Sequence, residues 1–125
     1  MQLQVKGKNL EVSESIRDYA ERKLAKIDKQ VHELTRVEVE LAVERNPSVA
    51  ANQIAEATVW LKGHTLRVHE ATRDMKASID ELAEKLSRQI RDDRDKKASR
   101  RKHVDKHALD ARAHAVESGI ADPGA

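Results

Sequence analysis

The stretch DMKASIDELAEKLSRQIRDDRDKKASRRKH, residues 74–103, continues to add cations after its apolar residues have stopped at Ile90. The dipole of a helix favours cations near the C-terminus, which accounts for basic residues from Arg88 to Arg94. It does not account for the next five, which are too many for one helix end: Lys96, Lys97, Arg100, Arg101 and Lys102. Such a run is typical of a contact with nucleic acid or another anionic surface, and a solubilising tail is the alternative.

A second group of charges lies in residues 13–31, SESIRDYAERKLAKIDKQV, where the apolar side chains follow the spacing of an amphipathic helix. On a wheel of about 100° per residue the apolar residues span about 80°. The acidic residues fall at about 120–200°, and the basic ones at about 220–280°, with Lys23 near 340°. The separation of acidic from basic side chains around the helix forgoes most i,i+4 ion pairs and produces a positive stripe. A short helix could also show such a separation by chance. The acidic set is Glu14, Asp18, Glu21 and Asp28, and the basic set is Arg22, Lys26 and Lys29.

Other residue types that could do chemistry form weak patterns. His103, His107 and His114 have helical spacing, but nothing supplies a fixed further ligand for a metal, and the chain has no Cys. The acidic pairs Glu38/Glu40 and Asp92/Asp93 lack a nucleophile or a Gly-rich loop nearby. Trp60 could stack on a base, but isolated exposed aromatic residues are common. We therefore expect no enzyme activity, no metal and no cofactor.

The elements that must position these charges follow from hydrophobic periodicity. Residues 3–7, 35–44, 54–63 and 65–71 alternate apolar and polar side chains, which predicts four strands with one buried face each. Residues 13–31 and a segment that begins near Thr72 or Asp74 predict two helices. The crossover places the first two strands parallel, and the others follow as an antiparallel meander. The prediction is an α+β protein, a β-α-β-β-β-α two-layer sandwich with both helices on one face of a four-stranded sheet.

Length and composition suit one domain with a tail. The chain has 125 residues, of which 38% are hydrophobic and 37% charged, and its net charge is +2. The first 95 residues hold 17 basic and 18 acidic residues, so the positive excess lies beyond them. We expect a folded domain over residues 1–97 and a basic, His- and Ala-rich tail or linker, flexible, over residues 98–125. The N-terminus lacks the apolar core of a signal peptide and no run could cross a bilayer, so a cytoplasmic location is the default.

Several stretches together resemble a known family. IRDYAERKLAKIDK, VEVELAVERNP and DMKASIDELAEKLSRQI are similar to the bacterial ribosome hibernation-promoting factors, also called sigma-54 modulation proteins, over about residues 1–97. The resemblance implies the same fold and binding to the small ribosomal subunit and its rRNA, in the channel for mRNA and tRNA. There the protein would block translation and protect idle ribosomes, in the stress response and stationary phase. A double-stranded RNA-binding module that is not specific to the ribosome is the alternative.

The resemblance also implies which residues bind rRNA. Carried over by position, the first helix contributes Lys23, Lys26 and Lys29, and the second contributes Lys85, Arg88 and Gln89. Arg22 and Arg91 are added as basic neighbours. Lys76 stands where relatives often have Tyr. Long forms of the family carry a C-terminal dimerisation domain, so we expect this chain to be a monomer, with a dimer possible only if such a domain is missing here. No membrane and no small-molecule substrate are expected.

Overall fold

A computed structural model describes the backbone of residues 1–117 and the side chains of residues 1–96. The elements follow in the order β1 (Gln2–Gly7), α1 (Glu14–Leu24), the 3₁₀ helix η1 (Ala25–Lys29), β2 (Arg36–Val43), β3 (Gln53–Leu61), β4 (His64–Thr72) and α2 (Met75–Glu117). The chain divides into two compact units, residues 1–90 and 91–125, and everything from β1 to Ile90 of α2 belongs to the first.

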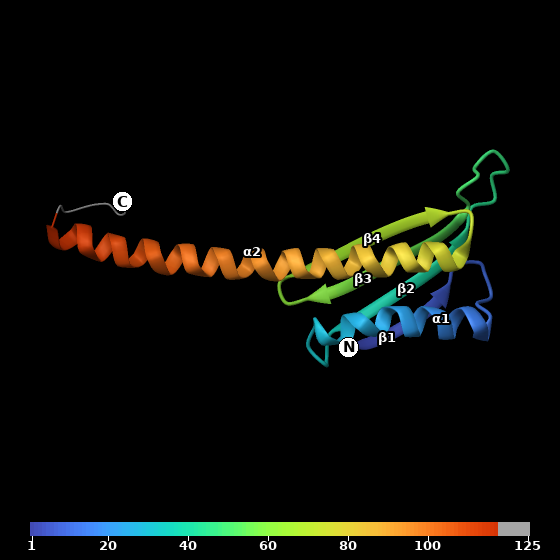
Figure 1. Cartoon of the computed structure of the whole chain (residues 1–125), viewed down its shortest axis with the longest axis horizontal. Helices are drawn as coiled ribbons and strands as arrows, with labels where there is room; N and C mark the ends of the chain where they lie inside the picture. Colours follow the sequence, from blue (N-terminus) through green and yellow to red (C-terminus); the bar gives the residue numbers. More distant parts are fainter. Residues whose placement is uncertain (118–125) are drawn as a thin grey trace. The chain divides into compact units, whose positions relative to one another are not determined.

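The sheet has the predicted topology. Its strand order is β1-β2-β3-β4, with β1 parallel to β2 and the other two pairs antiparallel (Figure 1). β3 ends earlier than the predicted strand over residues 54–63, because Leu61 pairs with His64 and Lys62 and Gly63 form the turn. Gly63 has a φ of 89°, a conformation that a side chain would strain.

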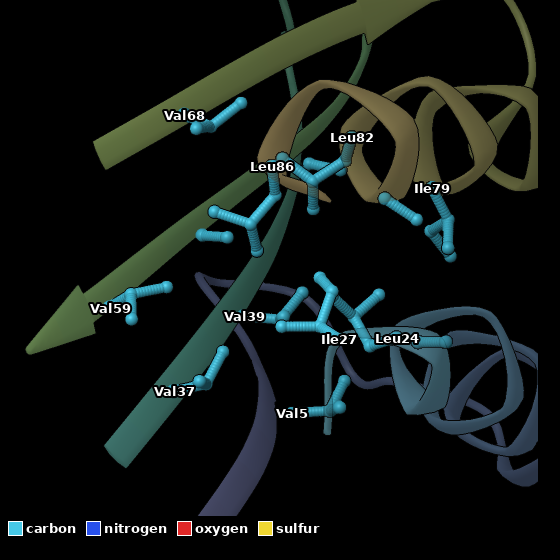
Figure 2. Close-up of a cluster of buried hydrophobic side chains, with 14 of the residues drawn as sticks. Val5, Leu24, Ile27, Val37, Val39, Val59, Val68, Ile79, Leu82 and Leu86 are labelled. Carbon is cyan, nitrogen blue, oxygen red and sulfur yellow. The ribbon is translucent and has the colours of Figure 1, made fainter. Parts of the chain in front are cut away.

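The core lies between one face of this sheet and the two helices, as predicted. Val5, Val37, Val39, Val59 and Val68 on the strands point toward Leu24, Ile27, Ile79, Leu82 and Leu86 on the helical elements (Figure 2). All of these residues are at most 3% exposed. Because strand side chains alternate, the other sheet face carries the polar residues, and within residues 1–90 the helices lie on the opposite, apolar face. This face is called the open sheet face below.

The first helix differs from the prediction at its C-terminal end. Ser13 caps α1, since its hydroxyl accepts a hydrogen bond from the backbone N–H of Ile16. The α-helix then ends at Leu24, and the chain tightens into η1 instead of continuing to Val31. In a 3₁₀ helix, residues three apart lie on the same side. The tighter turn therefore keeps Leu24 and Ile27 both fully buried.

The second helix begins after Asp74, whose carboxylate accepts a hydrogen bond from the backbone N–H of Ala77. Within residues 75–96, the apolar side chains that recur at helical spacing are buried. They are Met75, Ile79, Leu82, Leu86 and Ile90. The backbone helix then runs through the predicted boundary at Lys97 and ends at Glu117, so secondary structure does not break there. The side chains of the tail, including His103, His107 and His114, lie outside those that the structure describes, and the domain boundary stays a prediction.

Candidate nucleic-acid interface

The surface that α1, η1 and α2 turn away from the sheet carries most of the predicted RNA-binding residues. On α1 and η1, Arg22, Lys23, Lys26 and Lys29 are all exposed. Among the side chains of residues 1–96, Lys26 and Lys29 make no ion pair or side-chain hydrogen bond. They lie three residues apart in η1, and the 3₁₀ geometry places them on the same side. The two ammonium groups are therefore available to a ligand.

On α2 the predicted residues have different environments. Arg88 is exposed and, within the described side chains, has no acidic partner, whereas Lys85 is partly buried and lies 3.4 Å from a carboxylate oxygen of Glu70. Gln89 is partly buried. Arg91 is exposed but belongs to the second compact unit, so its position relative to the other predicted residues is not defined.

A hydrogen-bonded pair joins the end of η1 to α2. The Ser87 hydroxyl donates to the Gln30 side-chain carbonyl at 2.8 Å, and the Gln30 amide donates to the Ser87 backbone carbonyl at 3.4 Å. Each partner is the sequence neighbour of an exposed cation, Lys29 in one case and Arg88 in the other. The pair therefore links the backbone beside Lys29 to the backbone beside Arg88.

A second junction between the helices is centred on Tyr19. Its hydroxyl donates to Asp80 Oδ1 at 2.6 Å, and Lys23 Nζ lies 3.4 Å from the same oxygen. Three cations surround the ring at 5.3–5.8 Å from its centroid. The hydrogen bond to Asp80, together with desolvation, raises the pKa of the Tyr19 hydroxyl. We call this set the Tyr19 cluster: Tyr19, Arg22, Lys23, Lys76 and Asp80.

Sequence reasoning had missed Tyr19 and Asp80 and had given Lys76 no role. Each helix contributes an i,i+4 pair, Tyr19 with Lys23 and Lys76 with Asp80, and this spacing is visible in the sequence. Nothing in the spacing tells that the two pairs face each other, because 61 residues separate Tyr19 from Asp80. The pairing depends on how α1 and α2 pack on the sheet.

Several of the charges on the open sheet face pair with one another. Lys6 Nζ lies 2.9 Å from Glu38 and 3.7 Å from Glu40, and these carboxylates raise the pKa of Lys6, with the Glu38 hydrogen bond as the main cause. The Arg36 guanidinium lies 3.6 Å from Glu38 and 4.6 Å from the centre of the Trp60 ring. Trp60 lies on this face, as predicted, and is 38% exposed. Because Arg36 already stacks on it, its ring is a poorer platform for a base.

Among the residues that the structure describes, no group of three His, Asp or Glu side chains could hold a metal ion. No helix in that part of the chain combines the length and the apolar character that a membrane span needs. Glu38 and Glu40, considered above as an acid–base pair, are instead held by Lys6.

Fold and surface together define a class: a small α+β protein with a sheet covered on one face by helices that carry exposed cations, several of them without an acidic partner among the described side chains. Residues 3–98 match the family described as sigma 54 modulation protein / S30EA ribosomal protein. The match covers more than half of the chain, and the chain belongs to this family.

Individual relatives agree with this assignment. The chain is 37% identical over 105 residues to the ribosome hibernation promotion factor of Picosynechococcus sp., covering 83% of this chain and 54% of the relative. It is 34% identical over 99 residues to the ribosome hibernation promoting factor of Pseudomonas putida, covering 79% of this chain and 92% of the relative. The chain thus spans about half the length of the first relative and nearly all of the second.

Solved structures show the same architecture. The N-terminal domain of Protein Y from Thermus thermophilus superposes with a TM-score of 0.59 at 34% identity, covering 72% of this chain and 96% of that domain. A ribosomal subunit interface protein from Coxiella burnetii gives a TM-score of 0.64 at 23% identity, covering 75% of this chain and 98% of that chain. At that identity the second likeness supports the fold alone.

Proposed function

We propose that this protein is a ribosome hibernation factor that binds the small ribosomal subunit through its helices. Binding in the channel for mRNA and tRNA would block translation and protect idle ribosomes in the cytoplasm. The observation that carries the proposal is the set of unpaired cations at the junction of η1 and α2, in a chain that belongs to this family. The contact residues are Arg22, Lys23, Lys26, Lys29, Lys85, Arg88, Gln89 and Arg91.

The proposed mechanism is electrostatic and needs no catalytic step, cofactor or small-molecule substrate. Arg88 can hold a phosphate with two parallel hydrogen bonds, while Lys26 and Lys29 act as mobile point charges. Contacts of this kind fix position on an RNA surface without reading its bases. Selectivity for the ribosome would come from the shape of the rRNA surface, which must present phosphates to α1, η1 and α2 together.

We further propose that the 125-residue chain acts as a monomer and occupies ribosomes without joining them in pairs. The open sheet face supports this, because it carries charged residues and no large apolar patch accompanies Trp60 among the described residues. A stable dimer interface buries about 800 Å² on each partner. In a sucrose gradient, ribosomes saturated with this chain should sediment as single particles, and a peak of paired ribosomes would contradict this part of the proposal.

Cosedimentation with purified small subunits tests the ribosome assignment. The protein should pellet with the subunits at low salt, dissociate as salt rises because counterions compete for phosphate, and inhibit a cell-free translation reaction. A free RNA duplex of about 16 base pairs, the length that a double-stranded RNA-binding domain spans, serves as the control. Equal affinity for this duplex and for the small subunit would favour the general RNA-binding module instead.

A further inference from the structure

The Tyr19 cluster contains an anion of its own. Asp80 Oδ1 accepts the Tyr19 hydroxyl at 2.6 Å and lies 3.4 Å from Lys23 Nζ. The Arg22 guanidinium lies 5.8 Å from the centroid of the Tyr19 ring, and Lys76 Nζ lies 5.3 Å from it. One carboxylate therefore lies against Lys23 and at the hydroxyl of a ring that two further cations approach. This is an arrangement that a phosphate group could use in the same way.

The cluster is open to a ligand. The side chains of Lys23 and Asp80 are 47% and 44% exposed, so neither is sealed inside the protein. An ion pair at this exposure is weak, because water screens the two charges and the side chains lose freedom when they pair. A phosphate carries full negative charge and several acceptor oxygens, and can therefore compete with a carboxylate for the same ammonium group.

We propose that Asp80 is an internal competitor for RNA, occupying in the free protein the position that one phosphate group takes among Arg22, Lys23 and Lys76. The inference rests on the proposed function and extends it in two ways. Lys76 becomes a further phosphate-binding residue, and Asp80 becomes a residue that sets RNA affinity by lowering it. Lys26, Lys29 and Arg88 carry no such restraint in the part of the chain with described side chains.

A restraint of this kind lowers the affinity for every RNA that uses the Lys23 contact. Any RNA must displace the Asp80 carboxylate from Lys23 before it gains that contact, and every RNA bears the same cost. An RNA surface that also reaches the cations at the η1–α2 junction offsets the cost with additional contacts, whereas a short flexible strand offers fewer. Asp80 thus weakens an RNA that reaches only the Tyr19 cluster, while an RNA surface that also contacts the cations near the η1–α2 junction still binds. The ratio of the two affinities is set by those additional contacts and not by Asp80.

The test compares two variants with the same change in net charge. Asp80→Asn removes the competing charge and keeps an oxygen that can accept the Tyr19 hydroxyl. Glu56→Gln removes one negative charge from the open sheet face, where Glu56 of β3 stands opposite Glu40 of β2 in the strand register. Binding to a fluorescent 20-nucleotide uridine oligomer is measured by anisotropy over a series of salt concentrations, with circular dichroism to confirm folding.

The expected result is that Asp80→Asn binds the oligomer roughly two- to fivefold more tightly than wild type, the range expected for releasing a half-exposed ion pair. Its dependence on salt should steepen by about one counterion. Glu56→Gln reports the effect of net charge alone and should change affinity much less. Lys76→Ala should weaken binding, and in a Lys23→Ala background the gain from Asp80→Asn should fall to the level of Glu56→Gln.

Three outcomes overturn the inference: Asp80→Asn and Glu56→Gln bind alike, the gain persists without Lys23, or Asp80→Asn shows no detectable binding to the oligomer at low salt. Cosedimentation of the wild-type protein with small ribosomal subunits distinguishes a failure of the role of Asp80 from a failure of the proposed ribosomal function. A wild-type protein that pellets with the subunits while Asp80→Asn has no effect refutes only the role of Asp80. A wild-type protein that stays in the supernatant refutes the ribosomal function.

Discussion

The helix surface and the open sheet face carry similar residue types but use them differently. At the η1–α2 junction, Lys26, Lys29 and Arg88 have no acidic partner among the described side chains. On the open sheet face, Lys6 and Arg36 are both engaged by Glu38. Both surfaces belong to elements that share one hydrophobic core. They differ in whether their cations have a carboxylate partner. Composition alone would not distinguish them.

This difference shows where binding free energy is available. A cation that already has a carboxylate partner must give it up before it binds phosphate, whereas an unpaired cation loses only water. The helix surface contains both situations, since Lys26 and Lys29 are free while Lys23 and Lys85 are paired. We therefore expect the free cations to dominate affinity, the paired ones to modulate it, and the open sheet face to contribute little.

The largest effect should come from reversing two free cations. Lys26→Glu combined with Arg88→Glu should reduce cosedimentation with small ribosomal subunits below detection, because two attractive phosphate contacts become repulsive. Circular dichroism should stay unchanged, since both side chains are exposed. Wild-type affinity in this folded variant would show that the η1–α2 junction is not the interface.

Removing a buried hydroxyl should loosen the helix layer from the sheet. Ser78 is fully buried, its hydroxyl donates to the Gln53 backbone carbonyl at 2.6 Å, and it accepts from the Thr72 backbone N–H at 3.0 Å. Ser78→Ala should cost about 1–3 kcal/mol of unfolding free energy, because both groups lose their partner. Ser15→Ala, at an exposed position of α1, is the control and should leave the midpoint of thermal unfolding nearly unchanged. Equal midpoints for the two variants would contradict this role of Ser78.

Titration of Tyr19 should report the Asp80 contact directly. Tyr19 is the single Tyr of the chain, so absorbance near 295 nm follows this hydroxyl alone. Its pKa is raised in the folded protein, mainly by the hydrogen bond to Asp80, and Asp80→Ala, which removes the acceptor, should lower it toward the ordinary value. A raised folded pKa means that this contribution to stability is complete below the unfolded value near 10 and is lost as pH rises through the folded pKa. An identical titration in both proteins would rule out the contact.

Reversing charge on the open sheet face should have a smaller effect on binding. Arg36→Glu with Arg67→Glu changes net charge by the same amount as the reversal at the η1–α2 junction, and both residues lie on the open sheet face. Affinity for small subunits should fall only modestly at physiological salt, where screening extends over about 8 Å. A loss as large as that of the Lys26/Arg88 variant would show that net charge, and not its position, drives binding.

Shortening the tail should have the smallest effect on stability. Among the described side chains, the last buried residue of α2 is Ile90, which is also where the first compact unit ends. A chain that ends at Lys102 should therefore unfold within a few degrees of the full chain. A decrease of more than about 8 °C would mean that more than about 1 kcal/mol was lost and that the tail contributes to the folded domain.

Much of this protein could be predicted from periodicity. The alternation in residues 35–44 and the stripe from Met75 to Ile90 correctly indicated which side chains are buried, because each pattern reflects one element against one apolar layer. The crossover rule then decided that β1 and β2 are parallel. Family membership followed from the same stretches of sequence.

Only the tertiary structure decided the details that separate free cations from paired ones. The Tyr19–Asp80 and Gln30–Ser87 contacts join residues 61 and 57 positions apart, and they depend on the rotation of α1 and α2 about their axes. The change to 3₁₀ geometry after Leu24 depends on how Ile27 reaches the core. Helical periodicity specifies which face of an element is apolar, but not which polar side chain of a distant element it will meet. That choice is made by packing.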